Sequence, residues 1–315
     1  MSRTHGRHAI VILVALVATA IGCAPGQESQ DDGKPAAPPS VGRIHRLLSV
    51  DSLVLPIERY LFTDRQVGRV LRARAVLTAS CMRRYGHTWP VPASAAETGT
   101  LNPANTAHRY GLTDPVAAAR YGYHPAPGSP LGRTRKKGPP ASVPPSEAVM
   151  VVATGADRDG SPVHKDRSGR PIPRGGCLGE STVALSGDPD KIGNRELVGA
   201  INIGSHQQSQ RDSRVVAVFR DWSLCMQRHG HRYADPTEAP GASPQYNAEN
   251  PSRAEIALAR TDVACKRETN VVGVWSAVDA AYQRRAIKQH RAELDRVIHD
   301  IDTQVTRADR VLRGH

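Results

Sequence analysis

Aromatic side chains and long hydrophobic runs are both scarce in this 315-residue sequence. Aromatic residues make up 4% of it, only two of them are Phe, and the mean hydropathy is −0.43. A single apolar run occurs, and it is too short to cross a bilayer comfortably. This excludes a membrane protein with several spans and predicts a light hydrophobic core. The 24 Pro and 27 Gly lie below the level typical of disorder, so we expect a folded body.

Recognisable catalytic motifs are also absent. The sequence has no Gly-x-Ser-x-Gly elbow, no His-Glu-x-x-His, no Walker loop, no dinucleotide-binding fingerprint and no Lys-Thr-Gly. It therefore predicts no catalytic residue and no cofactor. A cell-wall-active hydrolase stays an alternative, because the two carboxylates of a glycosidase leave little local signature.

What is present begins with an export signal. Arg3 and Arg7 form a positive start, residues 9–21 are apolar, and the sequence Ala20-Ile21-Gly22-Cys23 resembles a bacterial lipobox. The expected chemistry is transfer of a diacylglycerol to the sulfur of Cys23, cleavage before it, and acylation of the new N-terminus, for example by palmitate. Two or three acyl chains hold a protein stably on a membrane. An ordinary signal peptide cleaved nearby and a single-pass anchor are the alternatives.

This signal predicts the organisation of the whole chain. Residues 1–22 are the expected signal peptide, and residues 23–45, which are small and polar at their start, the expected flexible tether. The extracytoplasmic body then covers residues 46–315. The predicted location is the outer face of the bacterial cytoplasmic membrane, which argues against nucleic acid as a partner.

The charge of the body is uneven. Residues 41–150 carry 15 basic and 6 acidic side chains, whereas residues 151–315 carry 24 and 21. A basic half near the membrane could face anionic headgroups, anionic wall polymers or envelope proteins. A solvated, arginine-rich surface is the simpler interpretation.

Helical periodicity predicts a mainly α body, a helical bundle of two quasi-repeats stapled by disulfides. The predicted helices cover residues 51–84, 116–121, 180–185, 195–206, 214–228 and 252–312, the last with a bend near residues 270–273. Pro-rich stretches over 87–150 and 230–251 predict long loops. We also expect a strand over 149–153 and one small β-hairpin over 163–172.

An apolar seam follows the last predicted helix. Its members recur every three or four residues: Leu294, Val297, Ile301, Val305, Ala308 and Leu312. Such a seam packs either on the body of the same chain or against a second copy in a dimer. Packing on the body is the favoured prediction.

Two nine-residue segments of the chain resemble each other. Residues 81–89 read CMRRYGHTW and residues 225–233 read CMQRHGHRY, so Cys, Met, Arg, Gly and His coincide. Both segments end a predicted helix, with Gly where a left-handed residue is favoured. We infer two related units over about residues 51–190 and 195–270, followed by a long C-terminal helix over about 252–313.

Four cysteines remain if Cys23 carries lipid, and an even number suits disulfides in an oxidising compartment. They are Cys81, Cys177, Cys225 and Cys265. Three pairings are open, and the repeat favours Cys81–Cys177 with Cys225–Cys265, because each repeated segment is followed by one further Cys. Chain entropy gives about 4.7 kcal/mol for the longer loop and about 4 kcal/mol for the shorter one.

Metal binding is the alternative use of the same repeat. Two thiolates and two imidazoles occur at equal spacing, in Cys81, His87, Cys225 and His231, and zinc or copper accepts such a set. However, Cys-x5-His is not a usual finger spacing, and Cys177 and Cys265 would remain unused. The sequence therefore predicts no metal ligands.

Several stretches are similar to uncharacterised secreted lipoproteins of actinobacteria. They are Cys81-Met82 with Gly86, Arg109–Pro115, Ala119–His124, Gly175–Glu180, Trp222–Met226, Asp262–Lys266 and Val274–Tyr282. The resemblance covers most of residues 55–285, and it departs from the expected pattern in the His, not an aromatic residue, after Gly86 and Gly230. It implies a location at the cell envelope and no activity.

These observations together predict a lipid-anchored envelope protein with a non-enzymatic binding or scaffolding role. A wall-active hydrolase is the first alternative. A metal-binding or small-molecule-binding lipoprotein is the second.

Overall fold

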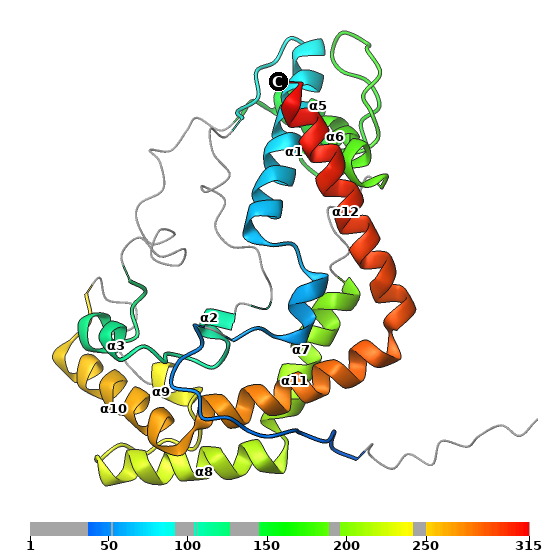
Figure 1. Cartoon of the computed structure of the whole chain (residues 1–315). Coiled ribbons are helices and arrows are strands. Elements are labelled where there is room, and N and C mark those ends of the chain that lie inside the picture. The colour runs from blue at the N-terminus through cyan, green and yellow to red at the C-terminus, as the bar shows by residue number, and fades with distance from the viewer. Residues whose placement is uncertain are drawn as a thin grey trace, which may run out of the picture. The chain divides into compact units, whose positions relative to one another are not determined.

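Helices make up nearly all the regular structure of the chain, as predicted (Figure 1). The computed structural model describes residues 37–51, 53–91, 104, 106–126, 145–188, 196–241 and 250–314. The predicted signal peptide, Cys23 and most of the Pro-rich loops lie outside these ranges. The described elements belong to one unit that begins at Pro38. No helix in the described ranges is long and apolar enough to cross a membrane.

The predicted helix over residues 51–84 is divided into two. A short 3-10 helix, η1, covers Pro56–Tyr60, and the long helix α1 covers Asp64–Arg84. The division follows from a capping box, in which Thr63 Oγ1 accepts from Gln66 N and Gln66 Oε1 accepts from Thr63 N. These bonds begin a new helix at Asp64.

Helix α1 packs against three other helices. They are α5 (Glu147–Thr154), α6 (Gly176–Ser186) and α12 (Arg291–Arg313). Val70 and Ala73 of α1 meet Leu185 of α6 and Ala308 of α12 in a shared apolar cluster. The first and last long helices of the described chain therefore lie side by side (Figure 1).

The remaining helices form a second group. The long ones are α7 (Glu196–Gln210), α8 (Ser213–Arg228), α10 (Arg253–Thr269) and α11 (Val271–Gln289), and the short ones are α2 (Thr106–Arg109), α3 (Pro115–Tyr121) and α9 (Glu238–Gly241). Helix α11 packs on α7 and α8, and α10 packs on α3 and α8. Trp222 and Trp275, both fully buried, lie in the core of this group. These two indoles contribute large buried apolar surfaces to the core of a chain that has few aromatic residues.

The predicted helix over residues 252–312 is three helices, α10, α11 and α12. The first break is at Asn270, whose φ of 60° is left-handed. Its side chain accepts a hydrogen bond from Leu47 N and donates one to His45 O, so the N-terminal segment holds the break in place. The second break is at His290, which no side-chain bond caps.

The apolar seam of α12 is packed on the body. Leu294, Val297, Ile301 and Ala308 are buried. The first three share a cluster with Leu55 and Ile57 around η1. The seam therefore packs on the body of the same chain, which is the favoured prediction.

The predicted strand over residues 149–153 is wrong, because these residues lie in helix α5. Three valines raise the strand propensity of this segment. The helix forms because Val152 and Ala153 can then be buried beside Cys81 and Cys177 on α1 and α6. Gly155, with φ 71°, ends it in a left-handed conformation.

The predicted hairpin over residues 163–172 is not confirmed. The described chain has isolated antiparallel bridges, Ala156 with Pro162 and Lys165 with Pro171, instead of paired strands. Each bridge closes a tight loop between α5 and α6, the first over residues 156–162 and the second over residues 165–171. In the second tight loop Asp166 N donates to Arg170 O, and beside it Ile172 N donates to His164 O.

Residues 38–45, which the sequence assigns to the tether, lie against the helices. Arg214 donates a hydrogen bond to the carbonyl of Pro39, and Val41 packs against the cluster that contains the two buried tryptophans. The segment continues to Leu47 and Val50 in the same cluster. This part of the chain is ordered by contacts with α8 and with the junction of α10 and α11.

Candidate functional site

The four cysteines form two disulfides, and the pairs are those that the sequence repeat favours. Cys81–Cys177 joins the end of α1 to α6, and Cys225–Cys265 joins the end of α8 to α10. The Cα atoms are 5.5 and 5.6 Å apart, and all four residues are buried. We call the two surroundings the first and second disulfide modules.

The helix ends in the two modules have the same backbone hydrogen bonds. In the first, His87 N donates to Met82 O and Gly86 N to Arg83 O; in the second, His231 N donates to Met226 O and Gly230 N to Gln227 O. The two glycines have φ of 79° and 82°, which only glycine adopts readily. The two segments therefore form the same helix-ending turn, for which the repeated Gly supplies the left-handed residue.

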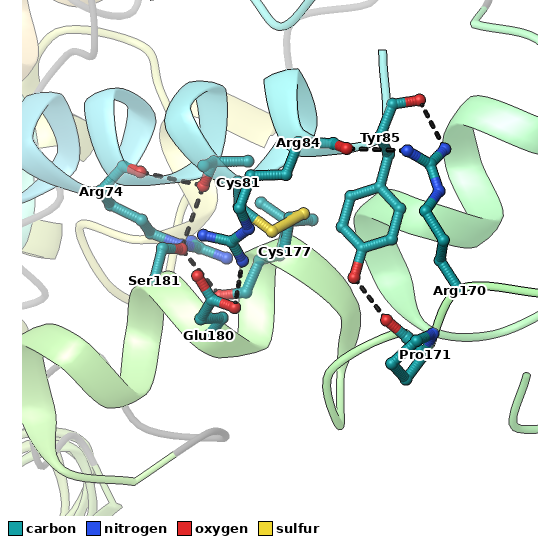
Figure 2. Close-up of a disulfide and its surroundings, with 11 residues drawn as sticks. Arg74, Cys81, Arg84, Tyr85, Arg170, Pro171, Cys177, Glu180 and Ser181 are labelled. Carbon is teal, nitrogen blue, oxygen red and sulfur yellow. Dashed lines mark hydrogen bonds and ion pairs between the residues drawn. A yellow bond between two sulfur atoms is a disulfide. The ribbon is translucent and has the colours of Figure 1, made fainter. Parts of the chain in front are cut away.

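An ion pair recurs at the same offsets from the cysteines. Arg84, three residues after Cys81, pairs with Glu180, three residues after Cys177, with an N–O distance of 2.6 Å (Figure 2). Arg228 and Glu268 occupy the same offsets in the second module and also pair. The hydrogen bond that Arg84 donates to the Glu180 carboxylate raises the pKa of Arg84. Each module is thus a helix pair joined by a disulfide and an adjacent ion pair.

The modules differ at the residue that precedes the glycine. In the first module this residue is Tyr85, which is buried and donates its hydroxyl proton to Pro171 O at 2.6 Å (Figure 2). In the second module it is His229, which is exposed. The first module is therefore covered by the loop around Pro171, whereas the second presents an imidazole beside its disulfide.

A pocket of about 390 Å³ lies beside the first module. Helix α5, the end of α1 and the second tight loop line it. Arg170 of that loop stacks over the Tyr85 ring, 5.1 Å from its centroid, and donates to the carbonyl oxygens of Arg84 and Tyr85 at 2.8 and 3.0 Å (Figure 2). These bonds place a cation at the negative end of α1, so the loop is held against the helix.

Some charged side chains of this pocket form ion pairs within the described residues and others do not. Asp166 accepts hydrogen bonds from Arg170 N, Arg170 Nε and Ser168 N. Burial raises the pKa of its carboxyl, but the bonds from Arg170 and Ser168 outweigh that effect and the pKa lies below its usual value. Lys165 and Arg167, both exposed, also line the pocket, and neither forms an ion pair within the described residues. An ionised, fully bonded Asp166 is poorly suited to donate a proton.

A buried polar network connects α2, α7 and α11. Arg109 donates from Nε and Nη2 to the two carboxylate oxygens of Asp279 at 2.6 and 3.1 Å, and the two side chains are 6% and 0% exposed. Arg109 also donates to Asn202, and Tyr110 donates its hydroxyl proton to Asp279 at 2.9 Å. Burial raises the pKa of Asp279, but its neighbours His206, Arg109 and Tyr110 outweigh that and lower it. Burial and the same carboxylate raise the pKa of Tyr110.

His206 gives this network the outline of a catalytic dyad. Its Nδ1 lies 3.5 Å from Asp279 Oδ2, and its ring stacks on Trp275 with centroids 5.0 Å apart. A triad would also need a free nucleophile. Ser209, on the same helix, donates to His206 O and accepts from Trp275 Nε1, so its hydroxyl is already used. The arrangement fits a structural network better than a nucleophilic site.

A second buried network lies between α3, α8 and α10. Lys266 Nζ donates to Asp262 Oδ2 at 2.9 Å, with side chains that are 1% and 0% exposed. Trp222 Nε1 donates to the other Asp262 oxygen, and the Tyr123 hydroxyl lies 3.2 Å from the first one. Burial, followed by the charge of Asp262, raises the pKa of Tyr123.

A buried His–Glu pair lies beside this network. His124 Nδ1 is 2.7 Å from Glu255 Oε1, which also accepts a hydrogen bond from Tyr123 N. A Cβ at Gly122 would lie 2.7 Å from the same oxygen. The helix stop at Gly122 therefore lets the chain turn closely over Glu255.

Many residues of the two networks, although not Asn202, His206 or Glu255, lie in the stretches on which the expected resemblance rests. Arg109 and Tyr110, Tyr123 and His124, Trp222, Asp262 and Lys266, and Trp275 and Asp279 all lie in those stretches. Composition and spacing predicted none of these contacts. The local signals are the i, i+4 spacings of Asp262 with Lys266 and of Asp279 with Gln283. Other partners are up to 170 residues apart.

The metal set suggested by the repeat is not assembled. Cys81 and Cys225 are in different disulfides, on different helices. Among the described residues, the group of three metal-ligating side chains that lie close together is Cys225, His229 and Cys265. His87 lines the pocket of the first module instead.

Comparison of the chain with protein families, with characterised proteins and with solved structures finds no match.

Proposed function

We propose that this chain is an exported lipoprotein, anchored through Cys23 to the outer face of the bacterial cytoplasmic membrane. The observation that carries the proposal is the pair of disulfides, because disulfides persist in oxidising compartments and are rare in the cytosol. The apolar residues 9–21 and the lipobox-like residues 20–23 would supply export and attachment. The resemblance to secreted actinobacterial lipoproteins fits the same location.

Substitution of the lipidated cysteine tests this proposal. We expect a Cys23→Ala chain to lose incorporation of an alkyne-tagged palmitate and to leave the membrane fraction, since the lipid would be its attachment. The measurement is fluorescence of the tagged band together with its distribution between membrane and soluble fractions. Ser29→Ala, a small change six residues away, should behave as the wild type. Undiminished membrane retention of Cys23→Ala would contradict the lipid anchor.

Within that location we propose a non-enzymatic binding role, with the pocket of the first module as the site. Its volume is in the range of ligand pockets. Lys165 and Arg167 outnumber Glu147, the lining acid that forms no ion pair within the described residues, and Val151 and Val163 give the pocket an apolar wall. A polymer with repeating phosphates or carboxylates would complement these cations. Such polymers occur on the bacterial wall, which the anchored body would face.

Charge reversal at the pocket tests the binding role. We expect Lys165→Glu with Arg167→Glu to weaken binding of poly(glycerol phosphate) by at least about 30-fold, because each lost cation contributes about 1 kcal/mol near an anionic surface and the new carboxylates add repulsion. The measurement is titration calorimetry at two salt concentrations, since the lost term is screened by salt. Arg158→Glu is the matched control, an exposed basic residue of the other tight loop that does not line the pocket. Equal weakening by this control would reject the pocket as the site.

A wall-active hydrolase is the competing proposal, since Glu147 and Asp166 both line the pocket. The lowered pKa of Asp166 does not favour it, because a glycosidase acid needs a raised pKa. Incubation with purified walls separates the two. Release of soluble fragments by the wild type, and none by Glu147→Gln, would replace the binding role with hydrolysis.

A further inference from the structure

The second disulfide module contains more ligand atoms than a disulfide needs. The sulfur atoms of Cys225 and Cys265 and a ring nitrogen of His229 all lie within 4.8 Å of one another. Glu268 Oε2 lies 3.6 Å from the sulfur of Cys225. Two sulfurs, an imidazole and a carboxylate therefore meet at one point, at the end of α8 and on the facing side of α10.

Helical spacing explains why these four side chains converge. Cys225 and His229 are four residues apart at the end of α8, and Cys265 and Glu268 are three residues apart on α10. Both spacings place side chains on one face of a helix. The two faces oppose each other across a Cα distance of 5.6 Å.

We propose that, when the Cys225–Cys265 disulfide is reduced, this group binds one thiophilic divalent cation of the Zn²⁺ class. Reduction by a dithiol adds two electrons and two protons, breaks the S–S bond and leaves two thiols, while the dithiol becomes a disulfide. The cation then displaces the two thiol protons and is held by two thiolates, the His229 imidazole and the Glu268 carboxylate. Such mixed sulfur, nitrogen and oxygen ligands suit zinc.

The geometry requires little movement. Zinc–sulfur bonds of about 2.3 Å in a tetrahedron place two sulfurs about 3.8 Å apart, so the reduced sulfurs need to separate by about 2 Å. Rotation of the two side chains supplies this without parting the helices. His229 is exposed, which gives the ion a route to two otherwise buried sulfurs.

The charges also balance. Two thiolates and the Glu268 carboxylate carry three negative charges, which a dication and Arg228 neutralise. Arg228 pairs with Glu268 Oε1, whereas Oε2 is the atom near the sulfur of Cys225. The ion pair therefore orients the carboxylate toward the proposed site and leaves one oxygen for the ion.

The first module serves as an internal comparison. It has the same disulfide and the same Arg–Glu pair, but Tyr85 stands where His229 would be. Tyr85 is buried and its hydroxyl is bonded to Pro171, so it supplies no ligand. We therefore expect one ion for each chain, at the second module.

Cobalt titration tests the site, with Co²⁺ as a coloured probe for Zn²⁺. The protein is the full chain with Cys23→Ala, reduced with a dithiol that is removed before titration. We expect one Co²⁺ to bind with a thiolate-to-metal absorption band, and His229→Tyr to weaken binding by about tenfold or more, since even the loss of an outer partner costs at least that. Cys225→Ala with Cys265→Ala should abolish the band. Cys81→Ala with Cys177→Ala should keep it.

Four results of the titration would overturn the proposal. They are unchanged affinity in His229→Tyr, two ions for each chain, an absorption band that survives without Cys225 and Cys265, and binding to the oxidised chain at equal affinity. Circular dichroism follows the fold in parallel. A reduced chain that loses its helical signal, and does not recover it with Co²⁺, would also reject the site.

Discussion

At the scale of single residues, the stability of this molecule depends on charges that are buried but paired. Arg109 with Asp279, and Lys266 with Asp262, are almost fully removed from water. Burial of an ion is costly, and the geometry of its partners decides whether that cost is recovered. Asp279 has bonds to Arg109, Tyr110 and Gln283, so its oxygens are well satisfied.

Loss of the Asp279 charge should therefore strongly lower the free energy of unfolding. We expect Asp279→Asn to lower the free energy of unfolding by about 3–5 kcal/mol at pH 7, because it leaves Arg109 buried without a counter-charge. The folded pKa of Asp279 is below its unfolded value, so its stabilisation is complete above about pH 4 and is lost as the pH falls through the folded pKa. The difference between variant and wild type should shrink in that acidic range.

Urea unfolding at several pH values measures this effect. Asp309→Asn is the matched control, because Asp309 also pairs with an arginine, Arg69, but the two side chains are 28% and 40% exposed. Such a pair contributes about 0.2–1 kcal/mol. A loss for Asp279→Asn as small as that of the control would contradict the structural role of the network.

At the scale of elements, the chain uses one device twice. A helix ends in a segment with Met, Arg, Gly and His, the cysteine directly before the Met joins it to a second helix, and an Arg–Glu pair adds to the contact. The partner helix comes 96 residues later in the first module and 40 residues later in the second. In a body with few aromatic side chains, these covalent links take over part of the role of the core.

Removal of the disulfide that closes the longer loop should destabilise the chain slightly more, because loop entropy grows with the logarithm of loop length. We expect Cys81→Ala with Cys177→Ala to lower the free energy of unfolding by about 4.7 kcal/mol, and Cys225→Ala with Cys265→Ala by about 4 kcal/mol, from loop entropy. Urea unfolding in a buffer without added oxidant or reductant measures both losses of unfolding free energy. Leu224→Ala, at a half-exposed position beside Cys225, is the control and should change stability little. Identical stability of a disulfide variant and the wild type would contradict the entropic role.

At the scale of the whole molecule, early and late parts of the sequence pack together. The last helix, α12, packs on α1, and the segment that contains His45 and Leu47 holds the junction of α10 and α11. The body begins at Pro38.

Particular residues show how far the sequence could predict this structure. Gly86 and Gly230 mark helix ends in the sequence and in the structure, because a helix stop at a left-handed glycine is local chemistry. The division at Thr63 was missed because the apolar period continues across it. The strand propensity of valine predicts a strand over residues 149–153. That prediction is wrong because this propensity is weaker than the gain from burying α5 beside the first disulfide.

The sequence by itself determined the helical class and the favoured disulfide pairing, and it predicts export with a lipid at Cys23. Periodicity, capping and a nine-residue repeat are local patterns, so they can be read along the chain. Only the tertiary structure decided that Arg109 meets Asp279, that a basic pocket forms beside Tyr85, and that His229 lies next to the second disulfide. Those contacts join residues on separate helices, and the packing of buried surfaces, which no local pattern specifies, brings them together.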